Sequence, residues 1–251
     1  MSDELDKRTL WDKLKEYTSA RIAIGRTGSS IPVQNLLEFK LAHAHARDAV
    51  YSMLDIDVLL NELAKHELPI LNLKSRAVHR EQYLQRPDLG RLIDESSNET
   101  LLTHKGRYDI VIIIVDGLSA TAIQQNADQL LNAVIPMFKA VKFTLAPICI
   151  VEQGRVAIGD DISAALNAKL SLVLIGERPG LSAADSMGAY ITFSPKPGLT
   201  DDSRNCISNI RAKGLPVQLA AEKIFHLIRQ AFRRQLSGVQ LKDDADERYF
   251  P

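Results

Sequence analysis

The sequence predicts an α/β protein with a Rossmann-like, doubly wound and mostly parallel sheet, preceded by a helical N-terminal region. Residues 110–115 form an unbroken β-branched run, which is typical of a strand buried on both faces, and a helix pattern follows at once. Further strand patterns then alternate with helix patterns, and this alternation favours a parallel sheet. We expect a helical region over residues 1–100 and a Rossmann-like domain over residues 101–251.

Composition and charge exclude several classes of protein. The 251 residues include 31 Lys+Arg and 31 Asp+Glu, so the chain lacks the basic excess expected of a nucleic-acid or membrane-surface protein. No apolar run reaches the roughly 18 residues of a membrane-spanning helix. Cys149 and Cys206 have no CxxC companion, and the charged N-terminus does not look like a secretory signal. We therefore expect a cytoplasmic protein without nucleic-acid or membrane partners.

The N-terminal region carries helix patterns. Apolar residues at helical spacing predict a helix over residues 5–24, which ends in a loop containing glycines and a proline. A second helix pattern spans residues 34–66, where Asp55 or Asp57 can cap a further turn. Residues 94–100 are polar throughout, so this stretch predicts a domain boundary or an inserted loop. The first hundred residues are therefore expected to be mostly helical.

The rest of the chain alternates between strand and helix patterns. After the strand over residues 110–115, a helix is expected to run toward Phe138. The last helix has a broad apolar stripe, which predicts packing against the sheet. The polar tail from residue 242 onward is expected to be loose. The remaining expected strands span residues 142–150, 170–175 and 190–193, and the remaining expected helices span residues 160–168 and 216–233.

The turn after the first predicted strand is a candidate binding loop, because ligands of open parallel sheets bind beyond the carboxyl ends of the strands. It reads Asp116-Gly117-Leu118-Ser119. Asp116 could hold a metal or a ligand hydroxyl, and the N-terminus of the next helix could receive an anion. Alternatively, Ser119 is only a helix cap and Gly117 only allows a tight turn.

Two further segments carry chemically active side chains. Residues 176–180 (GERPG) form a stiff turn with a fixed acceptor, which suits hydrogen bonding to an amide or hydroxyl of a large ligand. The alternative is an internal ion pair between Glu177 and Arg178. Residues 201–210 combine acceptors, donors and a thiol, which suggests a loop facing a ligand. Cys206 has neither a nearby histidine in sequence nor another sign of activation, so a nucleophilic role is not favoured.

No catalytic constellation can be assembled from the sequence. It contains no GxGxxG after a strand, no GxxxxGK[ST], no GxSxG, no HExxH and no Cys or His pair at metal-ligand spacing. The residues alone therefore predict a strand-end binding face without its own bond-breaking machinery. One such protein would be a stand-alone nucleotide-binding or regulatory module that uses Asp116 and Glu177.

Several unusual segments occur in a characteristic order. They are ARI at 20–22, GR at 25–26, ARDAV at 46–50, YLQRPDLGR at 83–91, DGLS at 116–119, GRVAIGD at 154–160, GERPGL at 176–181, NCISNI at 205–210 and SGV at 237–239. With them the chain resembles, over nearly its whole length, the small (light) subunit of adenosylcobalamin-dependent ethanolamine ammonia-lyase. Ala42 and residues 29–31 depart from the usual pattern of that family.

The resemblance implies a noncatalytic subunit of a hetero-oligomer built from pairs of large and small chains. A large TIM-barrel chain holds ethanolamine and the catalytic residues, and the small chain covers adenosylcobalamin at the interface. Homolysis of the cobalt–carbon bond starts a radical reaction that gives acetaldehyde and ammonia, so the cofactor carries the difficult chemistry. Residues 1–100 would contact the large chain, and residues 101–251 would bind cobalamin. The resemblance also implies a cytoplasmic enzyme that can be enclosed in a bacterial microcompartment.

The resemblance also assigns cofactor contacts. Carried over by position, they are Val156, Glu177 and Cys206, with no metal-binding residue in this chain. Glu177 would accept hydrogen bonds from corrin amides, Val156 would offer apolar contact or its backbone, and Cys206 would pack as a small soft group. The sequence lacks the Asp-x-His-x-x-Gly motif, by which other cobalamin proteins replace the nucleotide base with histidine. The base is therefore predicted to stay on cobalt.

Overall fold

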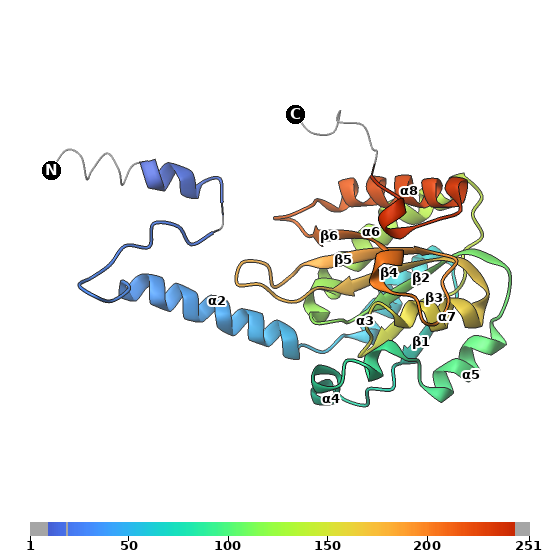
Figure 1. Cartoon of the computed structure of the whole chain (residues 1–251). Coiled ribbons are helices and arrows are strands. Elements are labelled where there is room, and N and C mark those ends of the chain that lie inside the picture. The colour runs from blue at the N-terminus through green and yellow to red at the C-terminus, as the bar shows by residue number, and fades with distance from the viewer. Residues whose placement is uncertain (1–9, 19, 244–251) are drawn as a thin grey trace.

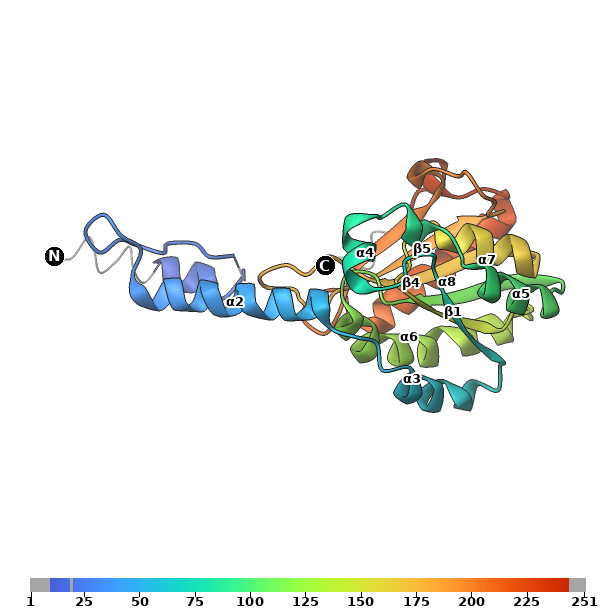
Figure 2. The ribbon, with the colours of Figure 1, turned by 90° about the horizontal axis from the view of Figure 1, so that it is seen from below.

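The fold is a six-stranded sheet, covered by helices on both faces, from which a helical arm projects (Figures 1 and 2). The computed structural model describes residues 10–18 and 20–243. The strands lie in the order β1-β3-β2-β4-β5-β6, in which the first four of this order are parallel, β5 is antiparallel to β4, and β6 is antiparallel to β5. Their bounds are β1 Ile70–Lys74, β2 Tyr108–Val115, β3 Ile148–Glu152, β4 Ala168–Gly176, β5 Met187–Phe193 and β6 Asn205–Ile210.

The α/β class is confirmed, but the sheet is mixed, whereas a mostly parallel one was expected. The difference arises at β5, which pairs with β4 in the opposite direction. Residues 177–186 connect these two strands without a helix. A parallel pair needs a crossover of a dozen or more residues, usually helical, so this short connection permits only an antiparallel return.

Helices cover both faces of the sheet, which explains why β2 is apolar from Ile110 to its end. Ile110, Ile112 and Ile114 belong to the core formed with α6 and α8, and the alternate residues of β2 belong to the core formed with α5 and α7. The helices are α2 Val33–Tyr51, α3 Ile56–Leu63, α4 Arg80–Gln85, α5 Glu95–Thr103, α6 Ala120–Ala140, α7 Ile158–Leu166 and α8 Val217–Arg234. Short 3-10 turns span Ala64–His66, Leu89–Arg91, Asp201–Ser203 and Gly238–Gln240.

Most of the elements predicted after residue 100 are confirmed. The strands over residues 110–115, 170–175 and 190–193 lie within β2, β4 and β5, and the predicted helices correspond to α6, α7 and α8. Only the end of the strand predicted over residues 142–150 forms, as β3. Lys142, with a φ of 62°, is not extended, and Leu145 makes only an isolated bridge with Ile110. In the predicted loose tail, residues 244–251 lie outside the described residues.

The N-terminal region differs more from expectation. Of the helix predicted over residues 5–24, residues 10–15 are helical, residues 20–24 are not, and residues 5–9 lie outside the described residues. The helix predicted over residues 34–66 is broken into α2 and α3, and Asp55 caps α3 by accepting the Val58 N–H at 3.1 Å.

Residues 70–100 also contain structure that was not expected. The polar stretch over residues 94–100 is not a loop, because Asp94 caps α5 by accepting the Ser97 N–H at 2.8 Å. In addition, β1 pairs with β3 at the edge of the sheet, so a segment before residue 100 belongs to the sheet.

Helix α2 forms the arm that projects from the sheet (Figures 1 and 2). Ala49, near its C-terminal end, is the one buried residue of this helix. Its exposed large apolar side chains are Val33, Leu36, Leu37, Phe39, Leu41 and Tyr51. This is the apolar composition of an interface on a helix that residues 20–24 and 180–184 cover only in part. None of the described helices combines the length and apolar character needed to span a membrane.

Candidate functional site

Turns from three neighbouring strands meet at the carboxyl edge of the sheet. The turn after β2 touches the end of β4, where the Leu118 N–H donates to the Gly176 carbonyl at 2.9 Å. Gly117 has a φ of 58°, and a Cβ at this position would lie 2.3 Å from the same carbonyl. Only glycine fits so close an approach in this conformation, so the two turns are held together by backbone contact.

A hollow of about 400 Å³ lies beside these turns. Its lining combines donors, an acceptor and apolar surface: Tyr83, Leu118, Arg155, Val156, Ile175, Gly176, Glu177, Arg178 and Tyr190. The structure therefore brings together Val156, which lies between β3 and α7, and Glu177, which follows β4, as expected for residues that follow the two parallel strands on either side of β2.

Both hydrogen bonds that fix the Glu177 carboxylate go to the same oxygen. Oε2 accepts hydrogen bonds from the Ser186 hydroxyl at 2.5 Å and from the Asn209 N–H at 3.2 Å. Oε1 makes no hydrogen bond among the described residues, and a Cβ at Gly188 would come within 3.0 Å of it. No ion pair joins Glu177 to Arg178 in the described part of the chain, so that alternative is not found. Glu177 is a fixed acceptor with one oxygen free for a ligand.

Cys206 lies at the border of this hollow. The segment expected to be a ligand-facing loop is partly the edge strand β6, in which Cys206 is exposed and pairs with Tyr190 of the lining. Burial of the sulfur raises the pKa of the Cys206 thiol and the Glu177 charge raises it further, although a hydrogen bond with Tyr190 lowers it. A raised pKa keeps the thiol protonated at neutral pH, which suits packing better than nucleophilic attack.

Tyr83 and Arg155 are members of the lining that the sequence did not single out as site residues. Tyr83 is fully buried, and its hydroxyl donates to the Gly154 carbonyl at 3.0 Å. The Arg155 guanidinium lies over the Tyr83 ring, 4.2 Å from its centre, and the buried Arg155 Nε has no hydrogen-bond partner. The available signal is that Tyr83 and Arg155 lie within two of the segments that carry the family resemblance, residues 83–91 and 154–160. A buried donor without a partner is unusual and points to a missing acceptor.

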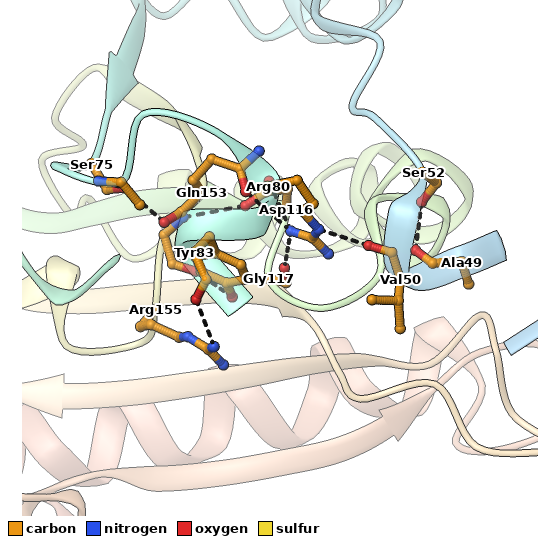
Figure 3. Close-up of polar contacts among 12 residues, drawn as sticks. Ala49, Val50, Ser52, Ser75, Arg80, Tyr83, Asp116, Gly117, Gln153 and Arg155 are labelled. Atoms are coloured by element: carbon orange, nitrogen blue, oxygen red, sulfur yellow. Dashed lines mark hydrogen bonds and ion pairs between the residues drawn. The ribbon is translucent and has the colours of Figure 1, made fainter. Parts of the chain in front are cut away.

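Asp116 does not face the hollow as a free carboxylate (Figure 3). It is 4% exposed, accepts the Gly154 N–H at 3.3 Å and lies 3.5 Å from the Arg80 guanidinium. Burial raises the pKa of Asp116 to about 6, although its hydrogen bonds and Arg80 act in the opposite direction. Ser119 caps α6 by accepting the Ala122 N–H at 3.2 Å. The structural alternatives for Ser119 and Gly117 are therefore confirmed.

The site has the chemistry of a binding face. In the part of the chain that the structure describes, no group of three or more His, Cys, Asp or Glu side chains is placed to hold a metal ion. Acceptor, donor and apolar groups instead converge on one open hollow at the strand ends. Fold and site together define an α/β protein with a candidate ligand-binding face at the strand ends.

Comparison with known proteins identifies the family. The family model described as ethanolamine ammonia-lyase light chain (EutC) matches residues 8–242. A protein of Pseudomonas fluorescens (strain Pf0-1) named ethanolamine ammonia-lyase small subunit is 49% identical over 245 residues, covering 96% of this chain and 89% of the relative. A protein of the same name from Azotobacter vinelandii (strain DJ / ATCC BAA-1303) is 48% identical over 240 residues, covering 94% of this chain and 89% of the relative. The chain belongs to the ethanolamine ammonia-lyase light chain family and is a component of a lyase complex.

Proposed function

We propose that this chain covers adenosylcobalamin with the hollow at the ends of β2, β3 and β4, in a complex whose large chain converts ethanolamine to acetaldehyde and ammonia. The observation that carries the proposal is the convergence of Val156 and Glu177 on one hollow, with Cys206 at its border. These are the contacts that the family resemblance assigns. The three positions lie far apart in the sequence, so their convergence in space is not expected by chance.

The chemistry of the lining fits the edge of a corrin. Corrin side-chain amides both donate and accept hydrogen bonds. Glu177 Oε1 is a free acceptor, and the buried Arg155 Nε is a donor without a partner. Val156 and Leu118 add apolar surface for the ring and its methyl groups. The hollow is smaller than a corrinoid, so this chain would cover one edge and the large chain would enclose the rest.

The chain's own residues bind and orient the cofactor. Glu177 would hold a corrin amide in a fixed direction, because Ser186 and the Asn209 N–H restrain the carboxylate. Val156 would exclude water from the ring edge, and the Cys206 thiol would pack without reacting. The bound cofactor supplies the radical chemistry. Since the Asp-x-His-x-x-Gly motif is missing, this chain would supply no histidine to replace the nucleotide base of the cofactor.

The arm supports a division of labour along the chain. We propose that residues 1–100 contact the large chain, chiefly through the exposed apolar side chains of α2, and that residues 101–251 hold the cofactor. The parallel strands β3, β2 and β4, with α6 and α7 on opposite faces, support a Rossmann-like description of the second part. Pairs of large and small chains would then assemble further, with ethanolamine on the large chain.

We also propose that the complex works in the cytoplasm, inside a bacterial microcompartment where one is present. Cys149 and Cys206 are free thiols, as is usual for a reducing compartment. The balanced charge of the chain supports the absence of nucleic-acid and membrane partners.

Reconstitution tests the proposal. The chain is mixed in the dark with its large partner and adenosylcobalamin, ethanolamine is added, and acetaldehyde is followed with each component omitted in turn. Activity should require both chains and the cofactor. Lack of activity with a cofactor-competent partner would contradict the proposal.

Glu177→Ala then tests the site. Loss of a charged acceptor should weaken adenosylcobalamin binding by the complex by about 10- to 100-fold. Glu99→Ala, at an exposed position on α5, is the matched control and should leave the affinity unchanged. If Glu177→Ala instead abolished nucleotide binding by the isolated chain, a nucleotide-binding module would be the better description. If Glu177→Ala left the affinity for the cofactor unchanged, the chain would be better described as a scaffold for its partner.

A further inference from the structure

Arg80 connects the arm to the turns after β2 and β3, which lie beside the hollow proposed for the cofactor (Figure 3). It is the first residue of α4, and its side chain is only 14% exposed. Its guanidinium reaches the end of α2 on one side and the ends of β2 and β3 on the other (Figure 3). These segments are distant in sequence, and the proposed function gives them different tasks.

On the arm side, Arg80 closes the end of α2. Its Nε donates to the Val50 carbonyl at 2.7 Å, and the Ser52 hydroxyl donates to the Ala49 carbonyl at 2.7 Å. The last carbonyls of a helix have no partner within the helix, so donors outside it fix where the helix ends and in which direction it leaves. Ser52 in turn receives the Thr121 N–H of α6 at 3.3 Å. The base of the arm therefore rests on Arg80 and on the start of α6.

On the cofactor side, Arg80 holds two turns. Its Nη1 donates to the Gly117 carbonyl at 2.8 Å and to Gln153 Oε1 at 3.3 Å. The same guanidinium faces Asp116, which accepts the Gly154 N–H at 3.3 Å. Gly154 begins the turn that contains Arg155 and Val156. Displacement of Arg80 would therefore loosen this turn.

Tyr83 adds a second route between Arg80 and the same turn. Its ring lies between two guanidinium groups, 4.9 Å from that of Arg80 and 4.2 Å from that of Arg155. The Tyr83 hydroxyl also binds the Gly154 carbonyl. This stack and the hydrogen bonds of Arg80 require a planar fork of donors in a fixed orientation, which lysine lacks.

We propose that Arg80 is a positioning residue that couples the direction of the arm to the shape of the turn over residues 153–156. The inference rests on the proposed function, in which the large chain holds the arm and the cofactor contacts Val156. Because coupling between two binding sites is reciprocal, each ligand then strengthens the binding of the other. Arg80 is not part of the lining of the hollow proposed for the cofactor and does not belong to α2.

Hydrogen exchange in the free full-length chain tests the link inside the molecule. In Arg80→Lys, exchange should rise about tenfold both in residues 47–53 and in residues 152–157, because local opening becomes easier in both segments. Exchange in α8 should not change, which distinguishes a local effect from general loss of stability. Arg86→Lys, which alters an exposed ion pair with Asp88 just after the same helix, is the control. A rise in one segment only, or in neither, would overturn the proposal.

Binding to the large chain tests the coupling itself. The affinity for the large chain is measured by titration with and without adenosylcobalamin, and the ratio of the two values gives the coupling. In the wild type the cofactor should tighten the association, and in Arg80→Lys this ratio should fall about tenfold or to one. If the wild type shows no ratio above one, the proposed function fails. If it does and Arg80→Lys keeps the same ratio, only the coupling is wrong.

A double variant separates positioning from charge balance. Arg80→Gln with Asp116→Asn removes both charges of the ion pair, so no unpaired charge remains buried. If Arg80 served only to neutralise Asp116, this variant would restore the wild-type ratio. We expect the coupling to stay lost, because glutamine cannot reach both Val50 and Gly117 with the same geometry. A restored ratio would therefore contradict the positioning role.

Discussion

Asp116 and Glu177 show how the folded chain gives two strand-end carboxylates different roles. Asp116 has both oxygens engaged, one by the Gly154 N–H and the other by Arg80. Glu177 has both of its hydrogen bonds on Oε2, which leaves Oε1 for a ligand. In sequence the two residues looked equivalent, since each follows a buried strand. Their partners, not their positions, make Asp116 structural and leave Glu177 available as the proposed binding residue.

Asp116 should make stability depend on pH. Its pKa of about 6 in the folded chain lies above the ordinary value of 3.8, so between these values the folded state binds more protons than the unfolded state. The contribution of Asp116 to the free energy of unfolding therefore falls as pH rises from about 4 to 6, by up to about 3 kcal/mol.

Urea unfolding of Asp116→Asn checks this expectation. The wild type minus Asp116→Asn difference in unfolding free energy should decrease between about pH 4.5 and pH 7. The Arg80 charge left without its partner lowers the stability of the variant at both pH values and does not change the sign of the slope. A flat or rising difference for Asp116→Asn would contradict the raised pKa.

Helices and strands that are buried on both sides could be predicted from the sequence. Those whose position or direction depends on the segments they contact could not. The β-branched run at residues 110–115 has no polar face, so it is expected in a central strand with both faces buried. In contrast, β1 and β6 are edge strands that carry polar residues, and their patterns are short. The direction of β5 depends on the loop before it. The polar pattern around Asp94 predicts a loop. The helix begins there instead because Asp94 accepts the Ser97 N–H, a single contact that the pattern does not reveal.

The same distinction holds for the candidate site. Val156, Glu177 and Cys206 came from a family resemblance, and their convergence follows from the strand order. Arg80 could not be found in this way, and the role of Tyr83, which begins the resemblance segment 83–91, could not be assigned, because both lie on α4, whose position against the ends of β2 and β3 is set by tertiary contacts. A sequence pattern carries no information about such contacts.

The ion pair between Arg204 and Asp160 should be the main attachment of β6 to α7. Two hydrogen bonds of 2.8 and 2.7 Å join the guanidinium to the carboxylate, and both side chains are almost fully buried. Asp160→Asn leaves a buried charge unpaired, which should lower the free energy of unfolding by about 3–5 kcal/mol. Asp201→Asn is the control: that carboxylate also faces Arg204, at 3.7 Å, but it is 88% exposed, so we expect a loss below about 1 kcal/mol. The free energy of unfolding of both variants is measured by urea unfolding. Equal losses would show that burial does not determine the strength of the ion pair between Arg204 and Asp160.

As a whole, the molecule consists of a well-packed sheet domain and an arm whose apolar surface is uncovered. Leu37 and Leu41 are 60% and 58% exposed on α2. Replacing both by glutamate should reduce self-association of the isolated chain in sedimentation experiments, because the apolar patch is interrupted. The same change should weaken binding to the large chain by at least about tenfold. Leu219→Glu, at an exposed position of α8, should change neither property. Unchanged affinity for the large chain would exclude α2 from the interface.

The uncovered arm also has a consequence for the supply of the two chains in the cell. Until a partner covers α2, each newly made copy presents the kind of surface that chaperones and proteases recognise. Copies made in excess of the large chain would stay in this state and be removed, whereas assembled copies would be protected. If the large chain covers α2 as proposed, the lifetime of the small chain would depend on the amount of its partner, so that degradation, in addition to synthesis, would set the ratio of the two chains.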